Sequence, residues 1–218
     1  MKKYIWLCLT VIVSVVYHQQ AKAQYYYDGQ KRVIQGYNPD VDDVVGTPFL
    51  SEKWIFGTIT NAQDKIFANV RLKYDVLDDM ILFAGANNEL LGFNENIKKF
   101  TLDHKTFANG FPKVDTLKTS TYYQVLTDGK ALLLKHYSKH IEKSYVYGSA
   151  VPKLRFVDDE AWYMFSNGKM ARIEPNSKSV INAIGDKKGE LLSFVSANKN
   201  VKGADGLTML VTYYNSLP

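Results

Sequence analysis

Two glycine-containing turns, each lying between strand-like segments, constrain the fold more than any other feature of the sequence. Asn167-Gly168 separates residues 162–165 from residues 170–173, and Asp128-Gly129 lies between two similar segments. Asn-Gly and Asp-Gly are typical of type I′ hairpin turns, because both central residues of that turn need a positive φ. The sequence therefore predicts at least two antiparallel hairpins.

The same alternation of short strands and turns runs through residues 54–174. Val70, Leu72 and Tyr74 alternate with charged residues, which is typical of a strand with one buried face. Strands that follow one another through tight turns form an antiparallel meander, whereas a parallel α/β sheet needs helical crossovers. We expect an α+β, mainly β fold, in which an antiparallel meander forms a curled sheet or an open barrel with short C-terminal helices.

The pattern changes to helical spacing near residue 177. Leu207, Leu210, Val211 and Tyr214 stand at i, i+3, i+4 and i+7 in the last segment. Residues able to cap the three expected helices are Ser177 or Ser179, then Asp186, then Asp205. Because short helices are marginal alone, the segment of about 177–217 is expected to pack on the sheet or on itself.

The N-terminus has the three parts of a secretory signal peptide. Lys2 and Lys3 are basic, residues 5–16 are apolar, and residues 21–23 form an A-x-A cleavage site. We expect cleavage between Ala23 and Gln24, which assigns residues 1–23 to the signal peptide. The apolar segment is shorter than the ~20 residues that a spanning helix needs, although an uncleaved anchor is the alternative.

Residues 24–46 are polar, include Tyr25-Tyr26-Tyr27, and show neither helical nor strand periodicity. They are expected to form an extended N-terminal arm, in which the tyrosines pack on the domain or stack on a sugar. Residues 47–218 are expected to form a single β-rich domain that includes the helical segment.

Charge and cysteine content restrict the chemistry of the exported chain. The sequence has 27 Lys and Arg against 22 Asp and Glu, but removal of Lys2, Lys3 and Lys22 lowers the net charge from +5 to about +2. No nucleic-acid partner is therefore expected. The only cysteine, Cys8, lies in the leader, so the mature chain has no thiolate nucleophile and no cysteine zinc site.

The histidines and paired acids are the candidate catalytic or metal-binding residues. His136 and His140, with Glu142 nearby, have the spacing of half a zinc site on a helix, but residues 130–137 are predicted to form a strand, which separates the two rings by about 13 Å. Asp158, Asp159 and Glu160 supply carboxylates for glycoside hydrolysis, or form a turn at a strand end. We assign no catalytic residue, no metal site and no cofactor.

Five further segments carry a resemblance. They are the Gly46-Thr47-Pro48-Phe49-Leu50 box, residues 54–59, 70–76 and 97–100, and the ending at residues 211–217, which includes Tyr213-Tyr214-Asn215-Ser216-Leu217. Together they resemble a family of small exported proteins of Gram-negative bacteria without an assigned activity. The resemblance covers about residues 46–217 and implies a cell-envelope or secreted setting without catalysis.

These observations favour a soluble protein of the periplasm or the extracellular space that acts by binding or assembly. Its expected partner is an unknown envelope protein or a small ligand, with no stable membrane insertion after cleavage. Two alternatives are an envelope glycan hydrolase using Asp158, Asp159 or Glu160, and a carrier. The carrier would hold an apolar ligand in a dry cavity lined by residues such as Phe83, Leu133 and Phe165.

Overall fold

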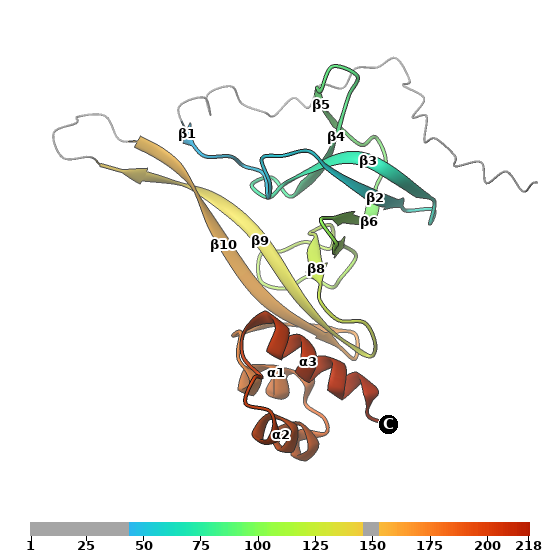
Figure 1. Ribbon diagram of the computed structural model, residues 1–218, viewed down its shortest axis with the longest axis vertical. Coiled ribbons are helices and arrows are strands. Elements are labelled where there is room, and N and C mark those ends of the chain that lie inside the picture. The colour runs from blue at the N-terminus through green and yellow to red at the C-terminus, as the bar shows by residue number, and fades with distance from the viewer. Residues whose placement is uncertain (1–43, 146–152) are drawn as a thin grey trace, which may run out of the picture.

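The computed structural model describes residues 44–145 and 153–218, which form one large mixed sheet with three C-terminal helices (Figure 1). The strands are β1 (Val44–Val45), β2 (Ile55–Asn61), β3 (Ile66–Asp75), β4 (Met80–Ala84), β5 (Leu90–Gly92), β6 (Ile97–Leu102), β7 (Lys105–Ala108), β8 (Tyr123–Val125), β9 (Ala131–Ser144), β10 (Lys153–Ser166) and β11 (Lys169–Ile173). The helices are α1 (Ser177–Ile184), α2 (Lys188–Ala197) and α3 (Gly203–Ser216). The expectation of a mainly β fold with C-terminal helices is confirmed.

The sheet differs from the predicted antiparallel meander in two places. Its order is β1-β10-β9-β8-β7-β6-β2-β3-β4-β5, with β11 also on β10, and it is not closed into a barrel. β2 pairs with β6 and not only with its neighbour in sequence, and β1 runs parallel to β10. The first difference follows from packing, because this pairing places Ile59 opposite Phe100, and both side chains are fully buried.

The Asn167-Gly168 hairpin has the predicted turn, since both residues have positive φ, 50° and 72°. The Asp128-Gly129 prediction is wrong in detail, because Gly129 has a φ of 121° but Asp128 does not have a positive φ. The conformation of this loop is fixed by hydrogen bonds to Asn215 of α3. The Asn215 side chain accepts a hydrogen bond from the N–H of Ala131 at 2.9 Å and donates to the carbonyls of Asp128 and Ala131 at 2.7 and 2.8 Å.

Three apolar clusters pack around the long β9–β10 pair. One lies under the helices and includes Leu133, Met164 and Leu210. The second lies against β2–β4, β6 and β7 and includes Phe100 and Phe107, with Tyr137 packed on it. The third, around Tyr123, Leu134 and Tyr163, lies on the opposite face of the β9–β10 pair, since Leu134 and Leu133 are neighbours on one strand.

The helices bury the predicted residues but begin elsewhere. Leu207, Leu210, Val211 and Tyr214 are buried, and Gly185 ends α1 with a φ of 73°. The predicted caps are wrong, because the residues before the three helices are Asn176, Lys187 and Lys202. Asn176 accepts a hydrogen bond from the N–H of Ser179 at 2.9 Å, which leaves Ser177 and Ser179 inside the helix. Asp186 lies before the Lys187 cap, and Asp205 lies in the first turn of α3.

The first described residues belong to the expected N-terminal arm. Val44–Val45 pairs with β10, so this part of residues 24–46 is a short strand, and the rest lies outside the described residues. The Gly46–Leu50 motif then runs beside β3. The N–H of Leu50 donates to Tyr74 at 2.8 Å, the N–H of Val76 donates to Pro48 at 3.0 Å, and Phe49 is buried. This motif therefore stabilises the end of β3.

Candidate functional site

The β9–β10 pair is a ribbon whose two strands are 14 residues long each. It runs from the helices to the opposite end of the molecule, where β1 lies beside it (Figure 1). We call residues 131–137 and 160–166 the proximal half of the ribbon, and residues 138–144 and 153–159 the distal half. The proximal half contacts all three apolar clusters, through residues such as Leu133, Leu134 and Tyr137.

In the distal half, polar contacts between the side chains of the two strands replace the apolar contacts of the proximal half. Arg155 donates to Glu142 from both Nε and Nη2, at 3.1 and 2.6 Å. Lys139 Nζ lies 3.2 Å from Asp158 Oδ1 on one face, and His140 Nδ1 lies 2.5 Å from Asp159 Oδ2 on the other. In each of these pairs the carboxylate is well exposed, although the Lys139 side chain is only 10% exposed. Because exposed ion pairs contribute only about 0.2–1 kcal/mol each, this half is held more weakly than the proximal half.

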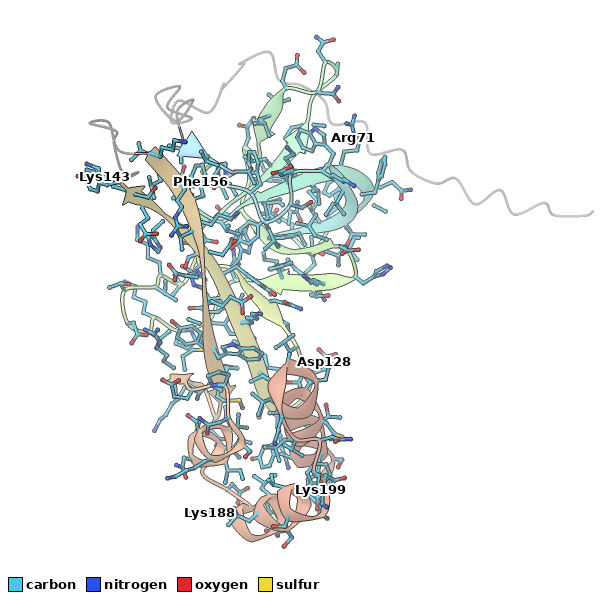
Figure 2. The ribbon with its side chains drawn as sticks, turned by 60° about the vertical axis from the view of Figure 1, so that its left-hand side comes forward. Arg71, Asp128, Lys143, Phe156, Lys188 and Lys199 are labelled. Carbon is cyan, nitrogen blue, oxygen red and sulfur yellow. The ribbon has the colours of Figure 1, made fainter. Side chains whose placement is uncertain are left out.

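Apolar side chains stand exposed at the distal end. Tyr145 is 76% exposed, Val45 is 65% exposed and Ile141 is 42% exposed. Ile141 is paired with Phe156, against which Gly46 also lies. Figure 2 shows Phe156 and Lys143 together at this end, far from Lys188 and Lys199 in the helical part. The distal end therefore combines charge with an exposed apolar strip.

One backbone edge of the distal half is open to a further strand. The N–H of Lys139 donates to the carbonyl of Val76 at 3.2 Å, on the side of β9 away from β10. Because backbone groups alternate between the two edges of a strand, Ile141 and Lys143 direct their N–H and C=O groups to the same side. Within the described part of the chain, no strand pairs with these two residues.

The outer edge of β10 is protected in a different way. β1 pairs with its first residues and β11 with its last, so on this edge residues 156–161 have no strand partner among the described residues. This stretch carries Asp158, Asp159 and Glu160 in succession, and charged side chains on an edge oppose strand addition. The β9 edge is also charged, at Lys139, Glu142 and Lys143, but it differs from the β10 edge in having the exposed apolar side chains of Ile141 and Tyr145 beside it, which a partner strand can cover.

The candidate metal residues lie on the predicted strand. His136 and His140 are both in β9 and point to the same face, about 13 Å apart. His136 is buried against the ring of Tyr123, and burial lowers the pKa of its imidazole. The Glu142 carboxylate, the third candidate ligand, accepts a hydrogen bond from Arg155. Among the described residues, no group of three His, Cys, Asp or Glu side chains is placed to hold a metal ion.

The candidate hydrolase residues lie within β10 and not at a turn. Asp158 contacts Lys139, Asp159 contacts His140, and Glu160 lies 2.6 Å from Lys135 Nζ. Asp158 and Glu160 share one face about 7 Å apart along one strand, while Asp159 points to the other face. This arrangement does not place two of these carboxylates across a cleft from each other.

The three residues suggested for an apolar cavity lie in different places. Leu133 belongs to the cluster under the helices, Phe83 packs on the cluster of β2–β7, and Phe165 packs on the cluster around Tyr123. They therefore do not line one shared cavity. The leader, its cleavage site at Ala23 and Gln24, and the tyrosines at residues 25–27 lie outside the described residues.

A buried polar contact ties the β3–β4 turn to the segment before β8. Tyr74 donates to Asp79 Oδ1 at 2.6 Å, and the N–H of Tyr122 donates to the same carboxylate at 3.3 Å. Burial raises the pKa of Asp79, although these hydrogen bonds act in the opposite direction. Burial also raises the pKa of Tyr74 well above its usual value, and the Asp79 charge adds to this effect. The contact stabilises the central core.

Sequence reasoning missed Ile141, Tyr145 and Asn215. The first two are single apolar residues in a polar stretch, and only the strand pairing shows that Ile141 lies on an open edge of β9, four residues before the exposed Tyr145. Asn215 stands in the C-terminal motif that carried the family resemblance. The sequence signal for Asn215 is its amide side chain in an otherwise apolar helical segment. Such a side chain needs hydrogen-bond partners when the helix packs on another element.

Comparison of the chain with protein-family models, curated proteins and solved structures gives no match. The resemblance to small exported proteins therefore stays a prediction. No helix in the described residues is long and apolar enough to cross a membrane.

Proposed function

We propose that this chain is an exported protein of the periplasm or the extracellular space that acts by binding or assembly, without catalysis. The distal half of the β9–β10 ribbon is the part that engages the partner. The observation that carries this proposal is the open β9 edge at Ile141 and Lys143, next to the exposed side chain of Tyr145.

The chemistry of this edge favours an extended segment of another protein. A strand added to an edge binds through backbone hydrogen bonds, and alternate side chains give specificity. Ile141 and Tyr145 would contact apolar residues of the partner strand. Lys143 lies between them and has no ion pair with a described carboxylate, so an acidic residue of the partner fits opposite it.

A proline substitution tests the edge without disrupting the ribbon. Because the N–H of Ile141 points away from β10, Ile141→Pro removes a donor for the partner and keeps the β9–β10 hydrogen bonds. Ile141→Thr is the matched control, since it shortens the side chain but retains the N–H. A photoreactive amino acid at position 145 reports contact in the living cell.

We expect a crosslink from position 145 to one discrete protein, which Ile141→Pro abolishes and Ile141→Thr preserves. The same photoreactive group at Leu192, which is 48% exposed on α2, is the control for non-specific capture. Equal crosslinking in the Ile141→Pro chain, or the same products from position 192, would show that the edge is not the binding surface.

Export rests on the leader sequence alone. N-terminal sequencing of protein isolated from the producing cells should begin at Gln24. A chain that begins at Met1 would contradict the proposed placement, whatever the crosslinking experiment gives.

A further inference from the structure

A second surface lies on the side of β2, β3, β6 and β7 that faces away from the core. Ile59, Phe100 and Phe107 point inward and are fully buried. Because side chains alternate between the faces of a sheet, the residues between them point outward. We call this surface the outer β2–β6 face and define it by Phe56, Thr58, Thr60, Arg71, Lys73, Lys99 and Thr101.

Three cations belong to this face, and two of them are held by aromatic rings. Arg71 lies 5.6 Å from the ring centre of Trp54, and Lys73 lies 5.2 Å from the same ring. Lys73 also lies 4.6 Å from the ring of Phe49. These contacts fix the cations in place without neutralising them.

Positive charge on the face is not balanced locally. Among the described residues, no carboxylate forms an ion pair with Arg71, Lys73 or Lys99; Glu52 is the acidic residue close enough to act on Lys73. Elsewhere on the molecule, as in the distal half of the ribbon, lysine and arginine do meet carboxylates. The face is therefore complementary to an anionic ligand.

The spacing of the cations indicates a long ligand. Arg71 stands opposite Phe56 on β2, whereas Lys99 stands opposite Thr60 from the other side of β2. Two strand spacings and four residue steps separate the two cations, which is about 15 Å in a regular sheet. One small anion does not reach both, so the ligand that uses both is a chain.

Hydroxyl groups and one aromatic ring lie between the cations. Thr58 and Thr101 are in contact through their hydroxyl oxygens at 2.9 Å, and Thr60 lies beside Lys99. Phe56 is 67% exposed and presents a ring next to Arg71. A face with cations, hydroxyls and an exposed ring matches the carboxylates, hydroxyls and C–H surfaces of an acidic sugar chain.

We propose that the outer β2–β6 face binds an acidic polysaccharide. A membrane surface fits less well, because among the described residues only Phe56 and the separate Ile66 expose large apolar side chains on this face. A nucleic acid fits less well because its phosphates are much denser than the cations here. This inference does not depend on the ribbon or on its partner.

The test is electrophoresis of the purified protein in native gels that contain polygalacturonate, with gels containing neutral dextran as the reference. We expect polygalacturonate to retard the protein and dextran to leave it unaffected. Arg71→Gln combined with Lys99→Gln should weaken binding about tenfold or more, since it removes two charge-assisted contacts. Phe56→Ser should weaken binding about threefold.

A matched pair of substitutions controls for net charge. Lys188→Gln combined with Lys199→Gln removes the same charge at the helical end, on the opposite side of the molecule from Arg71 (Figure 2). This control should retain binding within about twofold. Thermal unfolding of each variant verifies that the chain is folded.

Three results would overturn the proposal. They are absence of retardation by polygalacturonate, an equal loss of binding in the two double variants, and stronger binding of an oligodeoxythymidine or of phosphatidylglycerol vesicles than of polygalacturonate.

Discussion

At the residue scale, the hydrogen bond between Tyr74 and Asp79 is a stabilising interaction that no sequence motif predicts. Tyr74 is 1% exposed, and its hydroxyl donates to a half-buried carboxylate at 2.6 Å. We expect Tyr74→Phe to lower the free energy of unfolding by about 1–3 kcal/mol, because the carboxylate loses a donor that water does not replace. Urea unfolding at neutral pH measures this change.

Tyr145→Phe is the control for that substitution, since Tyr145 is 76% exposed and the same hydroxyl is removed from a solvated position. Its effect should stay within about 0.5 kcal/mol. If the two variants unfolded at the same urea concentration, the Tyr74–Asp79 hydrogen bond would contribute nothing measurable.

His136 makes stability depend on pH in the mildly acidic range. Burial lowers the pKa of His136 in the folded protein, whereas the unfolded chain titrates near ~6.5. The unfolded state therefore binds the proton first, and stability falls as the pH drops below about 6.5 toward the lower folded pKa. Above that pH both states are neutral and this contribution is constant.

We expect the free energy of unfolding of the wild-type protein to fall by up to about 1.4 kcal/mol for each pH unit of acidification, because of this one group. His136→Phe should not show this decrease. The substitution keeps a ring against Tyr123. Chemical unfolding between pH 7 and pH 5 gives the slopes. The exposed His104, changed to Asn, should retain the wild-type slope; a wild-type slope in His136→Phe would exclude His136 as the cause.

At the element scale, α3 is attached to the β8–β9 loop by the side chain of Asn215. Its three hydrogen bonds satisfy the buried Ala131 and the carbonyl of Asp128. A Cβ at Gly129 would lie 2.7 Å from the Asn215 side chain, so the loop and the helix end are fitted to each other. We expect Asn215→Ala to cost about 2–4 kcal/mol, because the N–H of Ala131 loses its partner.

Thermal unfolding measures this cost, with Asn182→Ala on the exposed side of α1 as the matched control. An equal melting temperature for the two variants would show that α3 does not depend on Asn215 for its position.

Some elements are predicted correctly from the sequence and others are not. The difference is whether the contacts that decide their geometry lie close together or far apart in the sequence. The Asn167-Gly168 turn and the apolar stripe of α3 depend on neighbouring residues, so both predictions are confirmed. The Asp128-Gly129 loop depends on Asn215, which is 87 residues from Asp128, so local turn preference gave the wrong geometry. The pairing of β2 with β6 is likewise decided by burial of Ile59 and Phe100.

In the candidate site, too, the features decided by local sequence are predicted and those decided by distant contacts are not. The strand assignment of residues 130–137 correctly separated His136 from His140. The sequence did not reveal that Asp158 and Asp159 contact Lys139 and His140, because these contacts require the register of the ribbon. An open edge is a property of the whole sheet, since it depends on which strands are neighbours.

At the scale of the whole molecule, the ribbon connects a well-packed end with a weakly packed end. Leu133 and Leu134 in the proximal half are fully buried in two clusters, whereas no residue of the distal half belongs to the buried part of a cluster. Local opening is cheapest where few apolar contacts are lost. The surface that we propose for binding is therefore also the part of the ribbon that opens most readily.

Hydrogen exchange tests this gradient along one pair of strands. The N–H groups of His140 and Glu142 should exchange at least about 100-fold faster than those of Leu132 and Leu134, because opening the distal half breaks ion pairs and opening the proximal half breaks the core. All four groups point toward β10, so their hydrogen-bonding geometry is matched. In salt of about 1 M, where charges are screened beyond ~3 Å, the distal groups should exchange faster still while the proximal groups are unaffected. Equal protection along the ribbon would mean that the distal half is held by contacts other than its ion pairs.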